Sequence, residues 1–313
     1  MVVLAASLAI WRIHPAEKEE VLRRVAADKP QLGPVLGLDQ YHVVLEGVVL
    51  PRIKENLSGL TYNHERHTLF GIINAPASLA EISLDGRLLQ LSRLRGFKDT
   101  EGVAFLGDNR FAVVEEHKLS IRIASIDQRG KVVPRSTGPP YALGQFLEKN
   151  AGLEGIGYDY DQGIYVVKEY VPAVCYRVDG LAMASGKPAG AIKLTVPFEA
   201  DPLGLEDLAG IECDYGTGNL LILSQISKRA LEVTKNGKVL SSIHLVQGKH
   251  GLSRTVPQPE GIATDRNGRL YIASEPNLLY VFARSNMASR VWQDAAMFTG
   301  PMEPRLDAAL TRW

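Results

Sequence analysis

The sequence carries no excess of charge of either sign. Its 313 residues include 35 Lys and Arg and 35 Asp and Glu, so the formal net charge is zero. Proteins that bind nucleic acids usually gather Lys and Arg into a patch or stripe, often with aromatic residues between them. No such stripe occurs in this chain, and we therefore expect no nucleic-acid partner.

Cysteine is nearly absent. Cys175 and Cys213 are the only two, and each lies within a run of residues typical of a β-strand. Two buried free thiols and one disulfide are both compatible with this pattern, because buried cysteines without a bridge behave as small hydrophobic side chains. The cysteines therefore leave the redox compartment open.

Long apolar runs are also missing, apart from "VVLAASLAIW" at residues 2–11. Ten residues are too few to span a bilayer, and the segment lacks the charged start and the cleavage pattern of a signal peptide. The charged segment that follows, residues 15–30, is predicted to be a helix between Pro15 and Pro30. Residues 1–35 are thus interpreted either as part of a membrane anchor with a charged helix, or as a helix that packs on the domain.

One short pattern occurs five times and is the main feature of the chain. Its copies are "LSGLTYN" at 57–63, "TEGVAFL" at 100–106, "LEGIGYD" at 153–159, "LAGIECD" at 208–214 and "PEGIATD" at 259–265. The central glycines are 43 to 55 residues apart, a spacing typical of propeller blades with about four strands. After each copy come a turn and an alternating segment rich in β-branched and aromatic residues, which predicts a β-hairpin and argues against a helical repeat.

These repeats predict an all-β fold, a five-bladed β-propeller over residues 40–285. Two outer hairpins are recognisable at residues 79–94 and 230–245, each with an Asp-Gly or Asn-Gly turn. The strand-like segment at 40–51 precedes the first repeat, and we expect it to close the ring by pairing in the last blade. The tail at 286–313 carries no repeat and is not assigned.

Two positions of the repeat vary together from blade to blade. One directly precedes the repeat glycine, and the other lies 14 or 15 residues after it, at the end of the second strand. Blades two, three and five have glutamate at both positions: Glu101 with Glu116, Glu154 with Glu169, and Glu260 with Glu275. Blades one and four have neutral residues instead: Ser58 with Asn74, and Ala209 with Gln225.

The start of a strand and the end of its antiparallel partner lie at the same end of a hairpin, so each of three blades is predicted to present two carboxylates side by side. If the first strand of every blade lines the central axis, the six glutamates converge at one mouth of the ring. Two unit charges about 4 Å apart repel by roughly 4 kcal/mol at an effective dielectric constant of about 20. The acids are therefore protonated, paired with bases or bound to a cation. Oxygen ligands alone favour a hard ion, calcium before magnesium. The alternative is that each acid is simply solvated at a strand end.

The repeat series, together with "PQPEGIA" at 257–263 and "LYIASEPN" at 270–277, resembles the SdiA-regulated family of bacterial envelope proteins from residue 41 to residue 283. This resemblance implies a five-bladed propeller, distantly similar to NHL-repeat propellers, behind an N-terminal membrane segment. It also implies a calcium site in the ring, for which Glu101, Glu116, Glu154, Glu169, Glu260 and Glu275 are the matching candidates. It implies no known reaction. The implied location is the cell envelope, either anchored to the inner membrane through residues 2–11 or in the periplasm.

Three functions are compatible with these observations. The first is a calcium-binding module of the envelope that binds a protein or a small ligand, and the second is a calcium-dependent hydrolase or lactonase. The third is a metal-free structural propeller. No G-x-S-x-G motif is present, and His117 is the best candidate for a general base, although a surface loop histidine is the simpler interpretation. The segment 159–163 is interpreted as the hairpin turn of blade three, not as a calcium loop.

Overall fold

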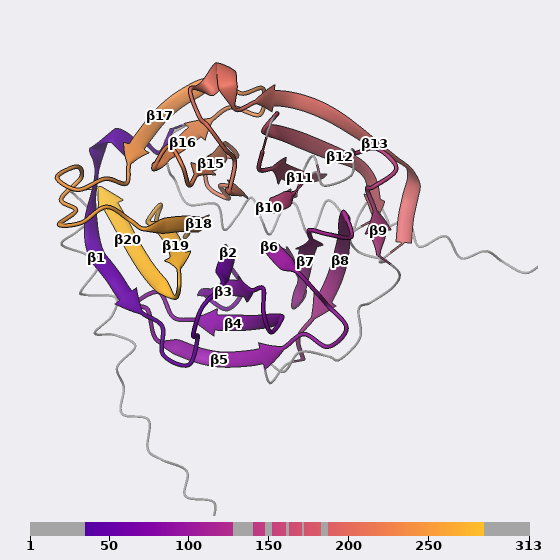
Figure 1. Cartoon of the computed structure of the whole chain (residues 1–313), viewed down its shortest axis with the longest axis horizontal. Helices are drawn as coiled ribbons and strands as arrows, with labels where there is room; N and C mark the ends of the chain where they lie inside the picture. The colour runs from indigo at the N-terminus through magenta and orange to yellow at the C-terminus, as the bar shows by residue number, and fades with distance from the viewer. Residues whose placement is uncertain are drawn as a thin grey trace, which may run out of the picture.

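Five four-stranded antiparallel sheets surround a central axis in the computed structural model (Figure 1). The structure describes residues 35–127, 140–147, 152–160, 163–170, 172–182 and 187–284. The predicted all-β, five-bladed propeller is confirmed, and the only helices in the described part are two short 3-10 turns, Leu38–Gln40 and Asp201–Leu203. The predicted segments at 2–11 and 15–30 and the tail at 286–313 lie outside the described residues.

Each blade consists of consecutive strands, the first nearest the axis, except that the last blade also takes the first strand of the chain. Blade one contains β2 (Leu57–Asn63), β3 (Thr68–Ile73), β4 (Ser78–Ile82) and β5 (Leu88–Arg93), and blade two contains β6 (Thr100–Gly107), β7 (Arg110–Glu115), β8 (Ser120–Ser125) and β9 (Tyr141–Ala142). Blade three contains β10 (Leu153–Asp159), β11 (Gly163–Lys168), β12 (Val174–Ala182) and β13 (Lys187–Glu199), and blade four contains β14 (Gly210–Cys213), β15 (Leu220–Ser224), β16 (Arg229–Val233) and β17 (Val239–His244). Blade five contains β18 (Gln258–Thr264), β19 (Leu270–Glu275), β20 (Leu278–Arg284) and β1 (Tyr41–Val49).

The predicted closing strand is confirmed. β1 pairs antiparallel to β20, from Tyr41 opposite Arg284 to Val49 opposite Leu278, so the two ends of the described chain meet in one sheet. The Arg284 side chain reinforces this closure by donating from Nε to the carbonyl oxygen of Leu36 over 2.7 Å. β1 thereby covers the outer edge of β20, which would otherwise stay unpaired.

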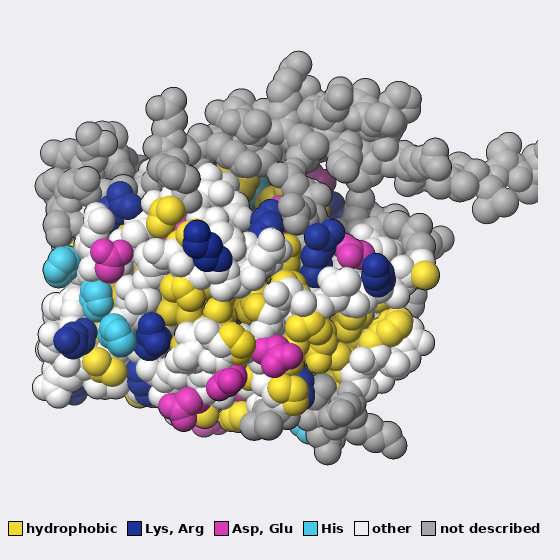
Figure 2. Space-filling view, turned by 90° about the horizontal axis from the view of Figure 1, so that it is seen from above, with side chains coloured by type: hydrophobic (Ala, Val, Ile, Leu, Met, Phe, Trp, Pro, Cys, Tyr) yellow, Lys and Arg dark blue, Asp and Glu magenta, His cyan; other side chains and the backbone are white. Residues whose placement is uncertain are grey.

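The hydrophobic core lies between neighbouring blades and not at the axis. It consists of five separate clusters, each formed by side chains from two adjacent sheets. The outer rim is less apolar, although some of its large hydrophobic side chains, such as Val196 and Val239, are exposed. Figure 2 shows part of the rim from the side, with hydrophobic and charged side chains next to one another. Cys175 and Cys213 are both buried and unbonded, which confirms the free-thiol alternative.

Within the described residues, no helix is both long and apolar enough to cross a bilayer.

Candidate functional site

The glutamates that precede the repeat glycines are bulge residues at the start of the inner strands. In blade two, Thr100 lies opposite Glu115 and Val103 opposite Val113, so β6 has one residue more than β7 over this interval, and Glu101 lies there. The same extra residue occurs around Glu154 in β10 and Glu260 in β18. A bulge interrupts the ladder and turns a side chain in a new direction. This local geometry is how three separate blades direct a carboxyl toward the axis.

The repeat glycines explain why these bulges lie so close to one another. A Cβ atom added to Gly102 would lie 2.4 Å from the carbonyl oxygen of Glu154 in the next blade, and one on Gly59 would lie 2.6 Å from that of Glu101. A Cβ on Gly261 would meet the backbone of Gly59 and Leu60 at 2.8 Å and 2.7 Å, which completes the circle. The inner strands of successive blades therefore touch backbone to backbone at the level of the acids.

The second glutamate of each pair follows or ends the second strand at the same face of the propeller. The amide of Glu116 donates to the carbonyl oxygen of Asp99 over 2.9 Å, and the amide of Glu169 donates to that of Gly152 over 3.0 Å. The two glutamates of each pair were expected to lie directly side by side, and this detail is corrected. The strand-end glutamate lies opposite the residue three positions before the repeat glycine. The first glutamate lies two residues farther along its strand, in the bulge.

All six predicted glutamates nevertheless belong to one electrostatic cluster, which we call the acidic cluster: Glu101, Glu116, Glu154, Glu169, Glu260 and Glu275. Each has a raised pKa, and burial is the largest cause in every case. Burial and then repulsion by Glu101 and other members raise the pKa of Glu154 to about 10. Burial and repulsion led by Glu275 raise the pKa of Glu260 to about 9. The structure thus brings the acids of three blades together at one face.

Hydrogen bonds moderate this repulsion at Glu101. Burial raises its pKa to about 7, against the opposing effect of hydrogen bonds from Ser58 and Asn74. These two neutral residues occupy the glutamate positions of blade one, so the departure of that blade from the acidic pattern has a structural role. Of the basic residues, Lys228 lies near Glu260 and Asp207, and its Nζ donates to the carbonyl oxygen of Pro257.

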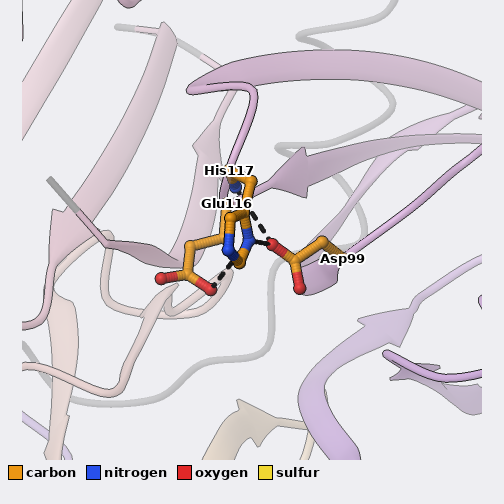
Figure 3. Close-up of side chains that lie close together, drawn as sticks. All are labelled: Asp99, Glu116 and His117. Atoms are coloured by element: carbon orange, nitrogen blue, oxygen red, sulfur yellow. Dashed lines mark hydrogen bonds and ion pairs between the residues drawn. The ribbon is translucent and has the colours of Figure 1, made fainter. Parts of the chain in front are cut away.

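Asp99, Glu116 and His117 form a second arrangement at the edge of the acidic cluster (Figure 3). The His117 ring nitrogen Nδ1 contacts Asp99 Oδ2 and lies 3.8 Å from Glu116 Oε2, and the His117 amide donates to Asp99 Oδ2 over 3.0 Å. One ligand atom from each of these residues lies within 4.8 Å of the others. The imidazole of His117 is largely exposed, and the Asp99 carboxylate holds its orientation.

Sequence reasoning missed Asp99 and Asp207, which occupy equivalent positions three residues before a repeat glycine. Asp99 has a positive φ of 56°, a conformation that Asp tolerates better than most residues. Asp207 is fully buried, and its carboxylate accepts the amides of Gln225 at 2.9 Å and Ile226 at 3.0 Å. It also raises the pKa of Glu169 and Glu260. The signal was available, since this position holds Asn, Asp or Gly in four of the five repeats.

The donor atoms of the acidic cluster are all oxygens, which suits calcium or magnesium and not a softer metal. Within the described residues, however, no three of the six glutamates place one oxygen atom each within 4.8 Å of one another. The ligand atoms of Asp99, Glu116 and His117 do lie within this distance. A cation among them would require their side chains to rotate inward. The residues therefore fit a hard cation by the chemistry of their donor atoms, but not by the present positions of their side chains.

The chain is similar to proteins of known structure and to one sequence family. A glutaminyl cyclase of Myxococcus xanthus is similar over 78% of this chain and 95% of its own, at 16% identity and a TM-score of 0.51. A calcium-binding regucalcin of Agrobacterium tumefaciens is similar over 77% of this chain and 94% of its own, at 13% identity and a TM-score of 0.46. The SdiA-regulated family model matches residues 35–283, which contain all five repeats and the closing strand. The chain therefore belongs to the SdiA-regulated family.

Proposed function

We propose that this protein is a calcium-binding propeller of the bacterial cell envelope that acts as a binding module for a protein or a small ligand. The observation that supports it is the convergence of the acidic cluster at one face of the ring. The charged groups that most strongly shift the pKa of Glu101, Glu154 and Glu260 are all carboxyl groups. A bound divalent cation is the simplest way to keep these groups ionised together at neutral pH.

Each part of the site has a defined task in this proposal. The bulge glutamates Glu101, Glu154 and Glu260 approach the axis from three blades and supply the nearest charges. Glu116, Glu169 and Glu275 stand behind them at the strand ends, and Asp99 adds a further carboxylate beside Glu116. Calcium suits this arrangement better than magnesium, because it accepts six to eight oxygens in a flexible geometry.

The envelope location rests on the apolar run at residues 2–11, followed by a charged segment, and on the family resemblance. A tether of this kind would hold the propeller at the inner membrane and leave its faces accessible in the periplasm. Fractionation of cells that express the full chain tests this part separately. Recovery of the protein in the cytosolic fraction would contradict it without affecting the calcium site.

A calcium-dependent hydrolase or lactonase is the second candidate, and the contact between His117 and Asp99 favours it. A carboxylate that orients an exposed imidazole is a common way to prepare a general base. A bound calcium ion would supply a Lewis acid that polarises a carbonyl oxygen. Lactone hydrolysis by the parent protein, lost in His117→Gln while calcium binding is retained, would identify this activity, and no turnover by the calcium-loaded parent would exclude lactones as substrates.

Thermal melting of the parent and of Glu154→Gln, each with calcium and with chelator, tests the metal site. A metal that binds only the folded state adds about 2.7 kcal/mol of stability at a hundredfold excess over its dissociation constant. We expect chelator to lower the Tm of the parent and to have little effect on Glu154→Gln, because glutamine keeps the shape but lacks the charge.

Glu199→Gln is the matched control for this experiment, since Glu199 is an exposed residue of β13 on the outer strand of the same blade. This variant should respond to chelator as the parent does. A parent whose Tm is the same in millimolar calcium and in chelator, together with a more stable Glu154→Gln, would show that the acids only repel one another.

A further inference from the structure

The opposite face of the propeller holds a second cluster of side chains, where the inner strands end. At a rise of about 3.3 Å per residue, the ends of these strands lie roughly 20 Å from the acidic cluster. The His64 ring stacks on Tyr215 at 4.9 Å with an interplanar angle of 14°, and it meets Phe105 at 5.1 Å and Tyr160 at 5.5 Å, both edge to face. These four rings come from four different blades, so they meet across the axis.

These rings cover a cavity that contains a buried carboxyl group. Glu212 belongs to β14 of blade four, and its side chain forms a hydrogen bond with Thr61 on β2 of blade one. Burial, followed by repulsion from Asp214, raises the pKa of Glu212 well above its usual value. We call this cavity the aromatic pocket, and its lining residues are Thr61, Tyr62, His64, Ala104, Phe105, Tyr158, Tyr160, Glu212, Cys213, Tyr215 and Thr264.

Glu212 differs from the other acids at this face, because those acids have strong partners within the protein. Asp159 pairs with Lys235, and Asp265 pairs with Arg269 at 2.6 Å. Asp214 accepts hydrogen bonds from Thr217, whose amide lies 2.6 Å away, and from the Thr264 hydroxyl. The lining of the aromatic pocket, by contrast, contains neither Lys nor Arg.

The size of the pocket restricts what can enter it. The space that the centre of a water molecule can reach is about 20 Å³, whereas the whole hollow with its open mouth measures about 330 Å³. This space is somewhat larger than one water molecule needs, so an ammonium group fits in the pocket, and a longer chain attached to it would pass out through the mouth.

We propose that the aromatic pocket binds the primary ammonium group of a ligand, with Glu212 as its counter-ion and the rings of Tyr160 and Tyr215 against its positive charge. An ammonium group has three N–H donors, which match the Glu212 carboxylate and the Thr61 hydroxyl. Aromatic faces attract such a cation most strongly where water is excluded. This site goes beyond the proposed calcium function and does not depend on it, because Glu212 and Thr61 lie about 10 Å farther along the inner strands than the bulge glutamates and the two sites share no residue.

The ammonium group has two sources with the same chemistry, a lysine side chain of a peptide and a free alkylamine. We would measure the binding of n-butylammonium and of Nα-acetyl-lysine methylamide by saturation-transfer NMR, once with calcium and once with chelator. We expect saturable binding of both probes that is independent of calcium. Tighter binding of the lysine derivative assigns the site to peptides, and equal or weaker binding assigns it to free amines.

Three further probes test the chemistry of recognition. n-Butanol has a similar shape without the charge, tetramethylammonium has the charge without N–H donors, and potassium chloride supplies a monovalent ion of small size. We expect none of them to displace n-butylammonium at equal concentration. Displacement by n-butanol would show a merely apolar pocket, and displacement by potassium at that concentration would show an inorganic ion site, so either result would overturn the proposal.

Variants locate the binding within the molecule. Glu212→Gln should weaken n-butylammonium binding by about tenfold or more, since a charge-assisted hydrogen bond is lost. Tyr215→Leu should weaken it several-fold and remains informative if Glu212→Gln fails to fold. Glu199→Gln, on the outer strand of blade three, should leave it unchanged. Unaltered binding by both pocket variants, or no saturable binding by the parent, would refute the site.

Discussion

At the scale of single residues, the repeat glycine is as important to the acidic cluster as the glutamate before it. Each glycine lets the next inner strand approach within a distance that a side chain would block. The glutamate then occupies a bulge beside this contact and points toward the axis. The motif is therefore a structural pair, in which glycine sets the spacing of the strands and glutamate supplies the charge.

Gly102→Ala tests this role. Because the new Cβ would lie 2.4 Å from the carbonyl oxygen of Glu154, which is backbone and cannot rotate away, the inner strands must separate. We expect the free energy of unfolding to fall by about 2 kcal/mol or more, as for other overpacked sites, in a denaturant melt. Gly144→Ala is the control, since a Cβ there meets Leu119 only at an ordinary 3.7 Å. Equal effects of the two substitutions would show that the close approach does not constrain the ring.

At the scale of secondary-structure elements, β1 is the strand that completes the propeller. Its residues pair along β20, and Leu36 and Leu38, just before it, are buried against blades four and five. The Leu36 amide donates to Glu232 of blade four over 2.8 Å, so this segment also connects two blades. The first strand of the chain, β1, is therefore needed to complete the blade that the last three strands form.

Two N-terminal truncations separate the contribution of β1 from that of the preceding segment. Deletion of residues 1–34 should leave a cooperatively folding protein, because it removes none of the described contacts. Deletion of residues 1–50 removes β1, exposes the edge of β20 and uncovers part of the core, so this protein should be insoluble or strongly destabilised. Circular dichroism melts of the two truncations check this, and similar transitions would place the closure elsewhere.

At the scale of the whole molecule, the acidic cluster links stability to pH. For a carboxyl group whose pKa is higher in the folded state than in the unfolded state, the folded state holds more protons between the two pKa values. Stability is then greatest below the unfolded pKa and falls as pH rises. For Glu154 this interval runs from the ordinary pKa of a glutamate, 4.5, to about 10.

In the presence of chelator, we therefore expect the parent to lose stability from pH 5 to pH 9. Each carboxyl group of this kind contributes up to about 1.4 kcal/mol per pH unit. Glu154→Gln cannot ionise and should show a shallower decline, whereas Glu199→Gln should follow the parent. Calcium should flatten the curve of the parent by favouring the ionised groups. Identical pH profiles for the parent and Glu154→Gln, measured by denaturant melts, would show that Glu154 does not titrate in this interval.

Much of the architecture could be predicted because local sequence patterns determine it. The five repeat glycines, the alternating strands after them and the Asp-Gly and Asn-Gly turns each depend on neighbours in the sequence, and together they define blades and their number. The closing strand could also be predicted, since a ring built from hairpins needs one more strand. The six glutamates were found because they vary together at two fixed positions of this frame.

The remaining features depend on contacts between blades, which no local pattern encodes. The repeat predicts a glutamate at a strand start, but the bulge and the backbone contact with the next blade decide where its carboxyl group points. Asp207 acts on glutamates of the two neighbouring blades, and Glu212 meets Thr61 across the axis. The sequence by itself therefore determined the number of blades and the candidate acids. Only the closed ring decided which charges face one another and which aromatic rings cover a buried carboxyl, because these relations arise when distant segments converge on one axis.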